Sequence, residues 1–196
     1  MIAIEPETAG DAAAIEALLD QSFGHDRWRK TAYRLRDGVA DLRALAFVAR
    51  QDGRLVGTIR FWPILLRDQA GAAKPAPALL LGPIAIAEHL RGKGVGMALI
   101  EAGVQAAQAL GHVHVLLVGD AAYYGRAGFS AATTGGIGLP GPFDPARLLA
   151  RQINPGPALP AAAVALPAFA QPGAGQQAQQ QAKRRPGRHK RRFAHA

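Results

Sequence analysis

The sequence predicts an α/β domain built around one central sheet, and residues 79–129 carry most of that prediction. An apolar run at 79–86 is typical of a strand covered by helices on both faces. A glycine-rich turn at 91–96 follows, and apolar residues then recur every three or four positions through 95–110, as in an amphipathic helix. A glycine turn at a helix start leaves backbone N–H groups free to bind an anion, so we expect a phosphate-bearing ligand there.

The chain is expected to begin with a short strand at 2–5, followed by a helix. Thr8 and Asp11 have the spacing of a capping box, in which a hydroxyl and a carboxylate three residues apart close the start of a helix. Apolar residues continue at helical spacing to Phe23, and Gly24 ends the helix.

Residues 25–38 are the most polar and aromatic part of the body, and we expect a second short helix there, closed by Gly38. Five basic side chains are distributed around it: Arg27, Arg29, Lys30, Arg34 and Arg36. One interpretation is a solvated basic helix in which Trp28 and Tyr33 are partly packed.

Two β-rich runs at 45–51 and 54–66 flank Asp52-Gly53 and predict a hairpin. Alternation along the second run places two sets of side chains on opposite faces. These sets are Leu55, Gly57, Ile59 and Phe61 on one face, and Val56, Thr58, Arg60 and Trp62 on the other. An arginine among apolar neighbours needs a partner or an opening, so Arg60 is expected to pair or to face a cleft. Residues 67–77 are expected to form an exposed loop.

The strand at 79–86 contains Gly82-Pro83, which predicts a bulge because proline cannot donate to a sheet ladder. A further strand is expected at 112–118. His112 and His114 share a face near its start, but no third ligand lies nearby in the sequence, so no metal site is predicted.

The last elements are expected to be short. Asp120 is a suitable N-cap for a helix that carries Tyr123 and Tyr124. A short helix is expected at 144–151, where an aspartate and a proline start the segment, and a last strand within 158–170.

Composition restricts the class of protein. The 196 residues are 49% hydrophobic, enough for one substantial core, and contain no run long enough to cross a membrane. The N-terminus lacks the pattern of a secretion signal, so a cytoplasmic protein is expected. The absence of cysteine excludes disulfides, thiolate metal sites and a cysteine acyl-enzyme.

The net charge of +9 is concentrated at the C-terminus. Seven of the 23 basic residues lie in 183–196, which leaves 16 basic and 14 acidic residues in the rest of the chain. We therefore expect a folded domain at 1–170 and a disordered tail at 171–196, rich in Gln and Ala and then basic. Binding of nucleic acid by such a tail would be weak and non-specific.

The spacing of the glycine turn excludes two familiar phosphate loops. Lys93 is followed by glycine, where a mononucleotide loop needs Ser or Thr, and the dinucleotide pattern lacks its third glycine. The pattern R-x-x-G-x-G, filled by Arg91, Gly94 and Gly96, is similar to the pyrophosphate-binding motif of the GNAT acetyltransferases. Tyr123-Tyr124 followed by Gly128-Phe129 resembles the Y-x-x-x-G-F signature of the same family, in its YhbS-like branch.

This resemblance implies the GNAT fold, with a mixed, mostly antiparallel central sheet and helices on both faces. The fourth and fifth strands are expected to splay into a notch that holds the pantetheine arm of acetyl-CoA on the backbone of Ile84 and Ile86, with the thioester near Gly82 and Pro83. The residues implied in binding acetyl-CoA are Ile84, Ala85, Ile86, Arg91, Gly92, Lys93, Gly94, Val95, Gly96 and Met97.

The resemblance also implies direct transfer of the acetyl group to a primary amine. Tyr124 occupies the position of the family's general acid, which protonates the leaving thiolate. Many relatives use a glutamate on the fourth strand as a base, but residues 79–87 contain no acid. The identity of the general base stays open. It could be a water chain or a group from 25–37 such as His25, or the reaction could need no base at all.

The acceptor site is expected from the first two helices and the hairpin, with Trp28, Tyr33, Arg60 and Trp62 as the implied residues. Basic groups of 25–37 then have a second interpretation, in which they select an acceptor that bears a carboxylate or phosphate. Two alternative functions are a non-catalytic CoA-binding module and a nucleic-acid-associated protein that acts through the basic tail. The identity of the acceptor and the choice between monomer and homodimer stay open.

Overall fold

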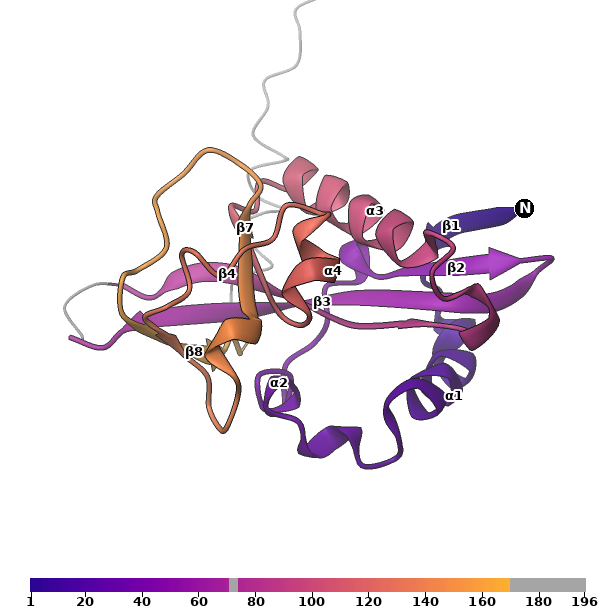
Figure 1. Ribbon diagram of the computed structural model, residues 1–196, viewed down its shortest axis with the longest axis horizontal. Coiled ribbons are helices and arrows are strands. Elements are labelled where there is room, and N and C mark those ends of the chain that lie inside the picture. The colour runs from indigo at the N-terminus through magenta and orange to yellow at the C-terminus, as the bar shows by residue number, and fades with distance from the viewer. Residues whose placement is uncertain (71–73, 170–196) are drawn as a thin grey trace, which may run out of the picture.

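A computed structural model describes residues 1–70 and 74–169 and places their strands in one sheet with the order β1-β2-β3-β4-β5-β7 (Figure 1). The strands are β1 (Ile2–Pro6), β2 (Phe47–Gln51), β3 (Arg54–Asp68), β4 (Ala76–Ile86), β5 (His114–Val118), β6 (Ile137–Gly138), β7 (Leu148–Gln152) and β8 (Ala163–Pro167). The expected tail at 171–196 lies outside the described residues, so the domain boundary stays a prediction.

Four α-helices and five short 3-10 turns connect the strands of the described residues. The helices are α1 (Ala12–Phe23), α2 (Thr31–Arg34), α3 (Val95–Ala109) and α4 (Ala121–Gly125). The 3-10 turns are η1 (Ala9–Asp11), η2 (Arg27–Arg29), η3 (Arg43–Leu45), η4 (Glu88–Leu90) and η5 (Pro145–Arg147). The expected capping box is present, because N–H and Oγ1 of Thr8 both donate to Oδ2 of Asp11, at 2.9 and 2.8 Å.

The sheet is mixed and mostly antiparallel, as the resemblance implied. Strands β1 to β4 are antiparallel neighbours, β4 and β5 are parallel, and β5 and β7 are antiparallel. Strand β3 is long enough to have two partners on one side, since its first half pairs with β2 and its last residues pair with β8.

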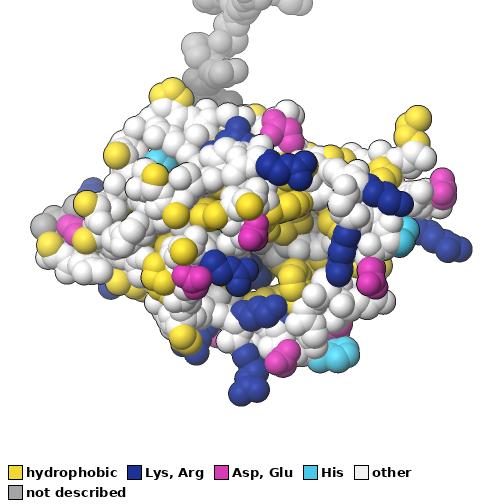
Figure 2. All heavy atoms as spheres, in the orientation of Figure 1, with side chains coloured by type: hydrophobic (Ala, Val, Ile, Leu, Met, Phe, Trp, Pro, Cys, Tyr) yellow, Lys and Arg dark blue, Asp and Glu magenta, His cyan; other side chains and the backbone are white. Residues whose placement is uncertain are grey.

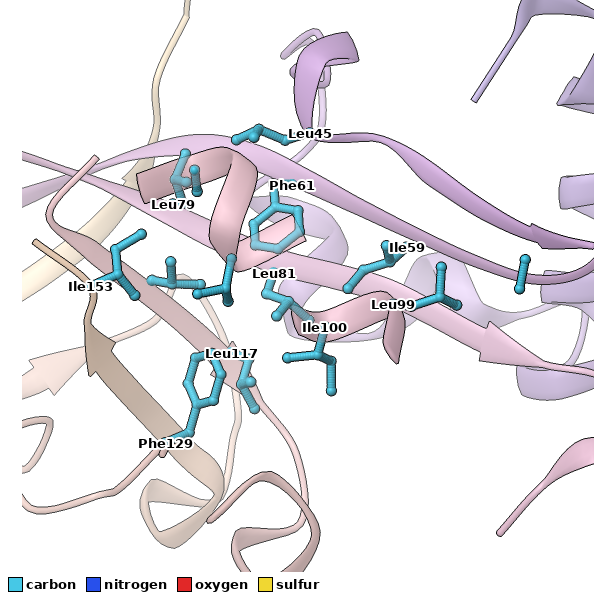
Figure 3. Close-up of a cluster of buried hydrophobic side chains, with 14 of the residues drawn as sticks. Leu45, Ile59, Phe61, Leu79, Leu81, Leu99, Ile100, Leu117, Phe129 and Ile153 are labelled. Atoms are coloured by element: carbon cyan, nitrogen blue, oxygen red, sulfur yellow. The ribbon is translucent and has the colours of Figure 1, made fainter. Parts of the chain in front are cut away.

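Helices cover both faces of the sheet, with α1 and α3 on opposite sides of β3 (Figure 1). Helix α1 buries Ile15, Leu18 and Leu19 against Val48 and Ala85. Helix α3 buries its apolar side against the opposite face, in a cluster that runs from Leu45 through Phe61 to Ile153 (Figure 3). The central strands are thus apolar on both faces because each face has its own helix.

Helix α3 approaches the sheet closely at Gly103. A Cβ atom built there would overlap Cε2 of Phe61 and lie 2.7 Å from Cζ, so the phenyl ring of β3 packs directly on the helix backbone (Figure 3). This contact fixes the distance between α3 and β3, the central strand next to β4.

One predicted alternation is wrong at the start of β3. Gly57, Ile59 and Phe61 face α3 as expected, but Leu55 packs in the α1 cluster and Val56 in the α3 core. The register explains the change, because Ala49 pairs with Gly57 whereas Arg50 pairs with Leu55. The extra residue in β3 is a bulge that reverses the alternation.

Three other predicted segments differ in extent. The expected loop at 67–77 is shorter, because β3 continues to Asp68 and β4 begins at Ala76. The expected helix within 25–38 is divided into η2 and α2 by an extended residue, Lys30. The expected helix at 144–151 is one 3-10 turn, and Leu148–Gln152 is instead a strand paired with β5.

Across residues 1–70 and 74–169, no helix combines the length and apolar character needed to cross a membrane.

The contact between α3 and β3 leads to a stability prediction with a built-in control. Gly103→Ala should lower the free energy of unfolding by about 1–3 kcal/mol, because overpacking against Phe61 outweighs the better helix propensity of alanine. Gly125→Ala, in α4 where nothing lies within 4 Å of the new methyl group, should raise it by up to about 1 kcal/mol. Urea denaturation of both variants measures the difference, and a destabilisation of similar size in both would contradict the packing explanation.

Candidate active site

Strands β4 and β5 separate soon after they meet. Their parallel pairing consists of Leu79 with Val115 and Leu80 with Leu116. Immediately beyond, β4 carries the predicted bulge, because Ile59 of β3 pairs with Ile84 whereas Phe61 pairs with Leu81. The extra residue falls at Gly82-Pro83, and the notch expected between the two strands opens at that point.

The bulge leaves one edge of β4 without a strand neighbour. The N–H of Ala87 donates to the carbonyl of Val56 at 2.8 Å, so that peptide group faces β3. Since successive residues of a strand direct their peptide groups to opposite sides, those of Ile84 and Ile86 face the notch. The carbonyl of Ile86 accepts from Nε of Arg91 at 3.4 Å, which agrees with this orientation and ties the glycine turn to the strand end.

The glycine turn adopts backbone angles that favour glycine. Gly92 and Gly94 have φ angles of +76° and +84°, and open space lies where their side chains would be. Gly94 is the N-cap of α3, so the N–H groups of the first helical turn have no partner within the helix. The partial positive charge of the helix start adds to them, which suits a phosphate.

A cavity of about 410 Å³, which we call the loop cavity, lies between this turn, the end of β4 and α4. Eight of the ten predicted CoA-binding residues line it: Ile84, Ala85, Ile86, Arg91, Gly92, Gly94, Gly96 and Met97. The other two do not, since the Val95 side chain is in the core and the Lys93 side chain is exposed. Val95 can therefore contribute its backbone N–H to a ligand, but not its side chain.

Four lining residues were not predicted as site residues, and one of them, Leu90, ends η4. Ser22 and Phe23 come from the end of α1, and Arg126 follows α4. Arg126 lies between Tyr124 and Gly128 of the tyrosine motif, and this position could have identified it from the sequence. The contribution of α1 depends on how that helix packs, which no local pattern shows.

Tyr124 lies where the loop cavity meets the notch. Its ring packs edge-on against Tyr123, with centroids 5.0 Å apart, and against Phe129, at 6.3 Å. Asp120 caps α4 by accepting from the N–H of Tyr123 at 2.7 Å. A Cβ atom at Gly119 would lie 2.6 Å from Cδ2 of Tyr124, so the glycine makes room for the ring.

Burial raises the pKa of the Tyr124 phenol to about 12; the neighbouring Tyr123 adds to the shift, and Arg147 opposes it. The hydroxyl therefore keeps its proton at neutral and mildly alkaline pH. It is available as a hydrogen-bond donor to any group in the notch.

Two further cavities continue from the loop cavity. The notch cavity, about 500 Å³, lies between Leu81–Ile84 of β4 and Leu117–Asp120 at the end of β5, and shares Phe23, Ile84 and Tyr124 with the loop cavity. Figure 2 shows this face as a hollow floored by hydrophobic side chains and bordered by several Lys and Arg side chains.

The third, the aromatic cavity, has a volume of about 560 Å³ and shares Tyr33, Arg36 and Pro83 with the notch cavity. It brings together all four residues predicted for the acceptor, because Trp28, Tyr33, Arg60 and Trp62 line it. Trp28 and Tyr33 meet edge to face at 5.0 Å, and Trp28 is 58% exposed at the mouth. Because the three cavities adjoin in series, they form one path through the notch.

Arg60 lines the aromatic cavity but has a structural partner. Its Nε and Nη2 donate to the two carboxylate oxygens of Glu7, at 2.7 and 2.8 Å, and the Glu7 side chain is only 1% exposed. Arg60 was expected either to pair or to face a cleft, and it does both. Its guanidinium is engaged, so its contribution to a ligand is limited.

The described residues offer few carboxylates along this path. Asp120 and Asp144 line the notch cavity, but each caps a turn by accepting from a backbone N–H. Glu16 and Asp37 line the aromatic cavity, where Glu16 pairs with Arg27. His25, one of the candidate bases, is 89% exposed, contacts Asp20, and lines none of the three cavities. Within residues 1–70 and 74–169, no group of three or more His, Cys, Asp and Glu side chains is arranged to hold a metal ion.

Comparison with known sequences points to one family. The profile of the Acetyltransferase (GNAT) family matches residues 12–129. The uncharacterised N-acetyltransferase YhbS of Escherichia coli K12 is 31% identical over 130 residues, which cover 66% of this chain and 74% of YhbS. The uncharacterised N-acetyltransferase YjhQ of the same strain is 29% identical over 134 residues, covering 68% and 71%.

Solved structures agree with these relatives. E. coli YhbS in complex with CoA superposes with a TM-score of 0.64 at 29% identity, covering 78% of this chain and 82% of that one. A GNAT acetyltransferase of Brucella melitensis in complex with acetyl-CoA gives 0.61 at 26% identity, covering 85% and 95%. Together with the notch, the glycine turn and a profile match over more than half of the chain, these similarities show that the protein belongs to the GNAT acetyltransferase family and has its fold.

Proposed function

We propose that this protein is an N-acetyltransferase that passes the acetyl group of acetyl-CoA directly to a primary amine. The observation that carries the proposal is the position of Tyr124, between a cavity that ends in a helix N-terminus and a notch with unpaired strand backbone. The cytoplasmic location expected from the sequence stays a prediction.

Acetyl-CoA fits the loop cavity and the notch in one orientation. Its pyrophosphate belongs at the start of α3, where N–H groups and the helix dipole meet it. The amides of its pantetheine arm then reach the peptide groups of Ile84 and Ile86, as an added strand would. The thioester consequently arrives near Gly82-Pro83 and Tyr124. The CoA and acetyl-CoA bound by the two similar structures support this assignment.

The proton transfer that the reaction requires can be carried out by a tyrosine in the notch. A neutral amine attacks the thioester carbon, the new N–C bond forms as the C–S bond breaks, and one proton must move from nitrogen to sulfur. A phenol with a pKa of about 12 is a weak acid towards a thiolate of pKa about 8.5, so simple proton donation is uphill by about 5 kcal/mol. Tyr124 acts more favourably as a relay, donating its proton to the sulfur while it accepts the proton that the nitrogen loses after the neutral amine has added to the thioester carbon.

A relay of this kind also accounts for the missing carboxylate of β4. When the amine arrives neutral, the proton that it loses ends on the sulfur, and no side-chain base is needed in the net reaction. The absence of a cysteine agrees with a direct transfer in a ternary complex.

The glycine turn can be tested with a variant matched for backbone strain. Gly94→Leu should abolish CoA binding, because the side chain enters the space that the pyrophosphate occupies. Gly111→Leu is the control, since Gly111 has nearly the same φ angle, +82°, and equally open surroundings at the far end of α3.

Both leucine variants should lose about 1–2 kcal/mol of stability from the left-handed backbone. Calorimetric titration with CoA should then separate them, with binding retained only in Gly111→Leu. Normal CoA binding by Gly94→Leu would show that the pyrophosphate lies elsewhere.

The role of Tyr124 predicts a loss in the chemical step alone. Tyr124→Phe keeps the ring that packs against Tyr123 and Phe129, so CoA affinity should be unchanged, whereas kcat should fall by about 10²–10⁴-fold. Tyr123→Phe, the same change at the neighbouring residue, should alter kcat by no more than a few-fold, because Tyr123 does not line the notch cavity. Free-thiol release with a panel of primary amines measures both. Equal kcat values for Tyr124→Phe and the unmodified protein would remove Tyr124 from the mechanism.

A further inference from the structure

The aromatic cavity contains buried donors that nothing in the described part of the chain satisfies. Oη of Tyr33, Nε and Nη1 of Arg36, and Nε1 of Trp62 are all inaccessible to solvent and have no hydrogen-bond partner among the described residues. All three residues line this one cavity. Buried polar groups are almost always paired in native proteins, so unpaired donors on residues around one cavity call for acceptors that a ligand or water would supply.

The type of these orphan groups restricts the ligand. An arginine guanidinium and an indole N–H can only donate hydrogen bonds, and a tyrosine hydroxyl can donate. A ligand that satisfies them must supply acceptors, and the guanidinium favours acceptors that carry negative charge.

The charges around the cavity restrict the ligand further. Three cations, Arg34, Arg36 and Arg60, and two anions, Glu16 and Asp37, line it. Arg60 is neutralised by Glu7, whereas within the described residues no carboxylate lies within 4.0 Å of the Arg36 guanidinium. Arg34 has no carboxylate within 4.0 Å among the described residues either, but it is exposed and its Nη1 donates to the carbonyl of Pro140 at 2.8 Å. Arg36 is therefore the one buried guanidinium of this cavity without a carboxylate partner in the described residues, and it matches a single negative charge, as on a carboxylate, better than the double charge of a phosphate monoester.

Arg36 is held in place by stacking. Its guanidinium lies 4.6 Å above the ring of Tyr33 and 6.0 Å from that of Trp62. Burial lowers its pKa to about 10, so it remains charged at neutral pH. These contacts fix the direction in which the guanidinium can bind a planar anion.

Arg36 also lies next to the expected thioester. Its Nη2 is 3.1 Å from the Cβ position of Gly82, in the bulge, and Arg36 lines both the notch cavity and the aromatic cavity. A group bound by Arg36 is therefore within a short chain of the acetyl carbon, which is where an acceptor amine must be placed.

We propose that the acceptor is a small amine that also carries one carboxylate, and that Arg36, with the indole N–H of Trp62 and the hydroxyl of Tyr33, binds this carboxylate. The proposal rests on the proposed acetyl transfer and names the substrate class. The apolar walls from Leu19, Trp28 and Pro83 suit the rest of such a molecule.

The first experiment compares acceptors in matched pairs, each an amino acid and its carboxamide, at one near-neutral pH where Arg36 is charged, with kcat/KM expressed per concentration of neutral amine. The carboxylate of each pair should be preferred by about 10–100-fold in kcat/KM, the usual effect of one hydrogen-bonded charge. In Arg36→Met this preference should disappear through a rise in the KM of the amino acid, with the KM of acetyl-CoA and kcat/KM of the carboxamide nearly unchanged. Arg29→Met, an exposed arginine that lines none of the three cavities, is the control and should keep the preference.

A stability measurement separates ligand binding from a structural role. Because Arg36 has no carboxylate partner in the described residues, replacing it with methionine removes a buried, unpaired charge, and the melting temperature should rise or stay the same. A fall in melting temperature together with an unchanged carboxylate preference would make Arg36 structural and overturn the proposal.

The second experiment tests the cavity without turnover, by calorimetric titration with 3-phenylpropionate, 3-phenylpropanamide and phenyl phosphate. The carboxylate should bind more tightly than the other two, and Arg36→Met should lose that binding. Tighter binding of phenyl phosphate would overturn the assignment to a carboxylate. If kcat in Arg36→Met falls equally for all acceptors, Arg36 contacts the thioester and not the acceptor carboxylate. This outcome would also overturn the proposal. Binding of 3-phenylpropionate through Arg36, with acetyl transfer to no amine, would contradict the proposed function and leave the carboxylate site intact.

Discussion

The separation of β4 from β5 is the constraint on which the rest of the site depends. Two paired positions join these strands, and the bulge at Gly82-Pro83 then turns β4 away. A regular sheet would satisfy the peptide groups of Ile84 and Ile86 with a neighbouring strand. The bulge instead leaves them without a strand partner and opens a cavity between the strands, so that a ligand can complete the sheet.

Close backbone contacts hold the surroundings of the notch in position. At Gly103, Gly96 and Gly119 an aromatic side chain occupies the space where a Cβ atom would be, from Phe61, Tyr123 and Tyr124 respectively. The first contact sets α3 on the sheet, and the other two place the tyrosines of α4 beside the glycine turn and the end of β5. Glycine thus serves here mainly to admit rings, in addition to the backbone freedom that Gly92 and Gly94 require.

The features that were predictable from the sequence are those that depend on residues near each other in the chain. The glycine turn, the bulge, the capping box and the tyrosine helix each rest on a few consecutive residues, and all were located correctly. The errors come from long-range pairing. Leu148–Gln152 is a strand because β5 offers it an edge, and the bulge at Val56 follows from the register with β2. Neither partner is visible in the local sequence.

The acceptor region likewise combines features that depend on local sequence with features that depend on long-range contacts. The basic and aromatic composition of 25–38 indicated a binding surface, and Trp28, Tyr33, Arg60 and Trp62 do line one cavity. Which arginine is free could not be read from composition, because the pairing of Arg60 depends on Glu7, 53 residues away in the chain. Arg36 became a candidate only when its neighbours were known.

The central claim is that the notch places the sulfur of CoA beside Tyr124. A crystal structure of this protein with CoA tests it directly. In that structure the pantetheine arm should run along Ile84 and Ile86, and the sulfur should lie within about 3.5 Å of Oη of Tyr124, in hydrogen-bond range. A CoA molecule whose sulfur lies outside the space between β4 and β5, or whose arm leaves the backbone of β4 unpaired, would contradict it.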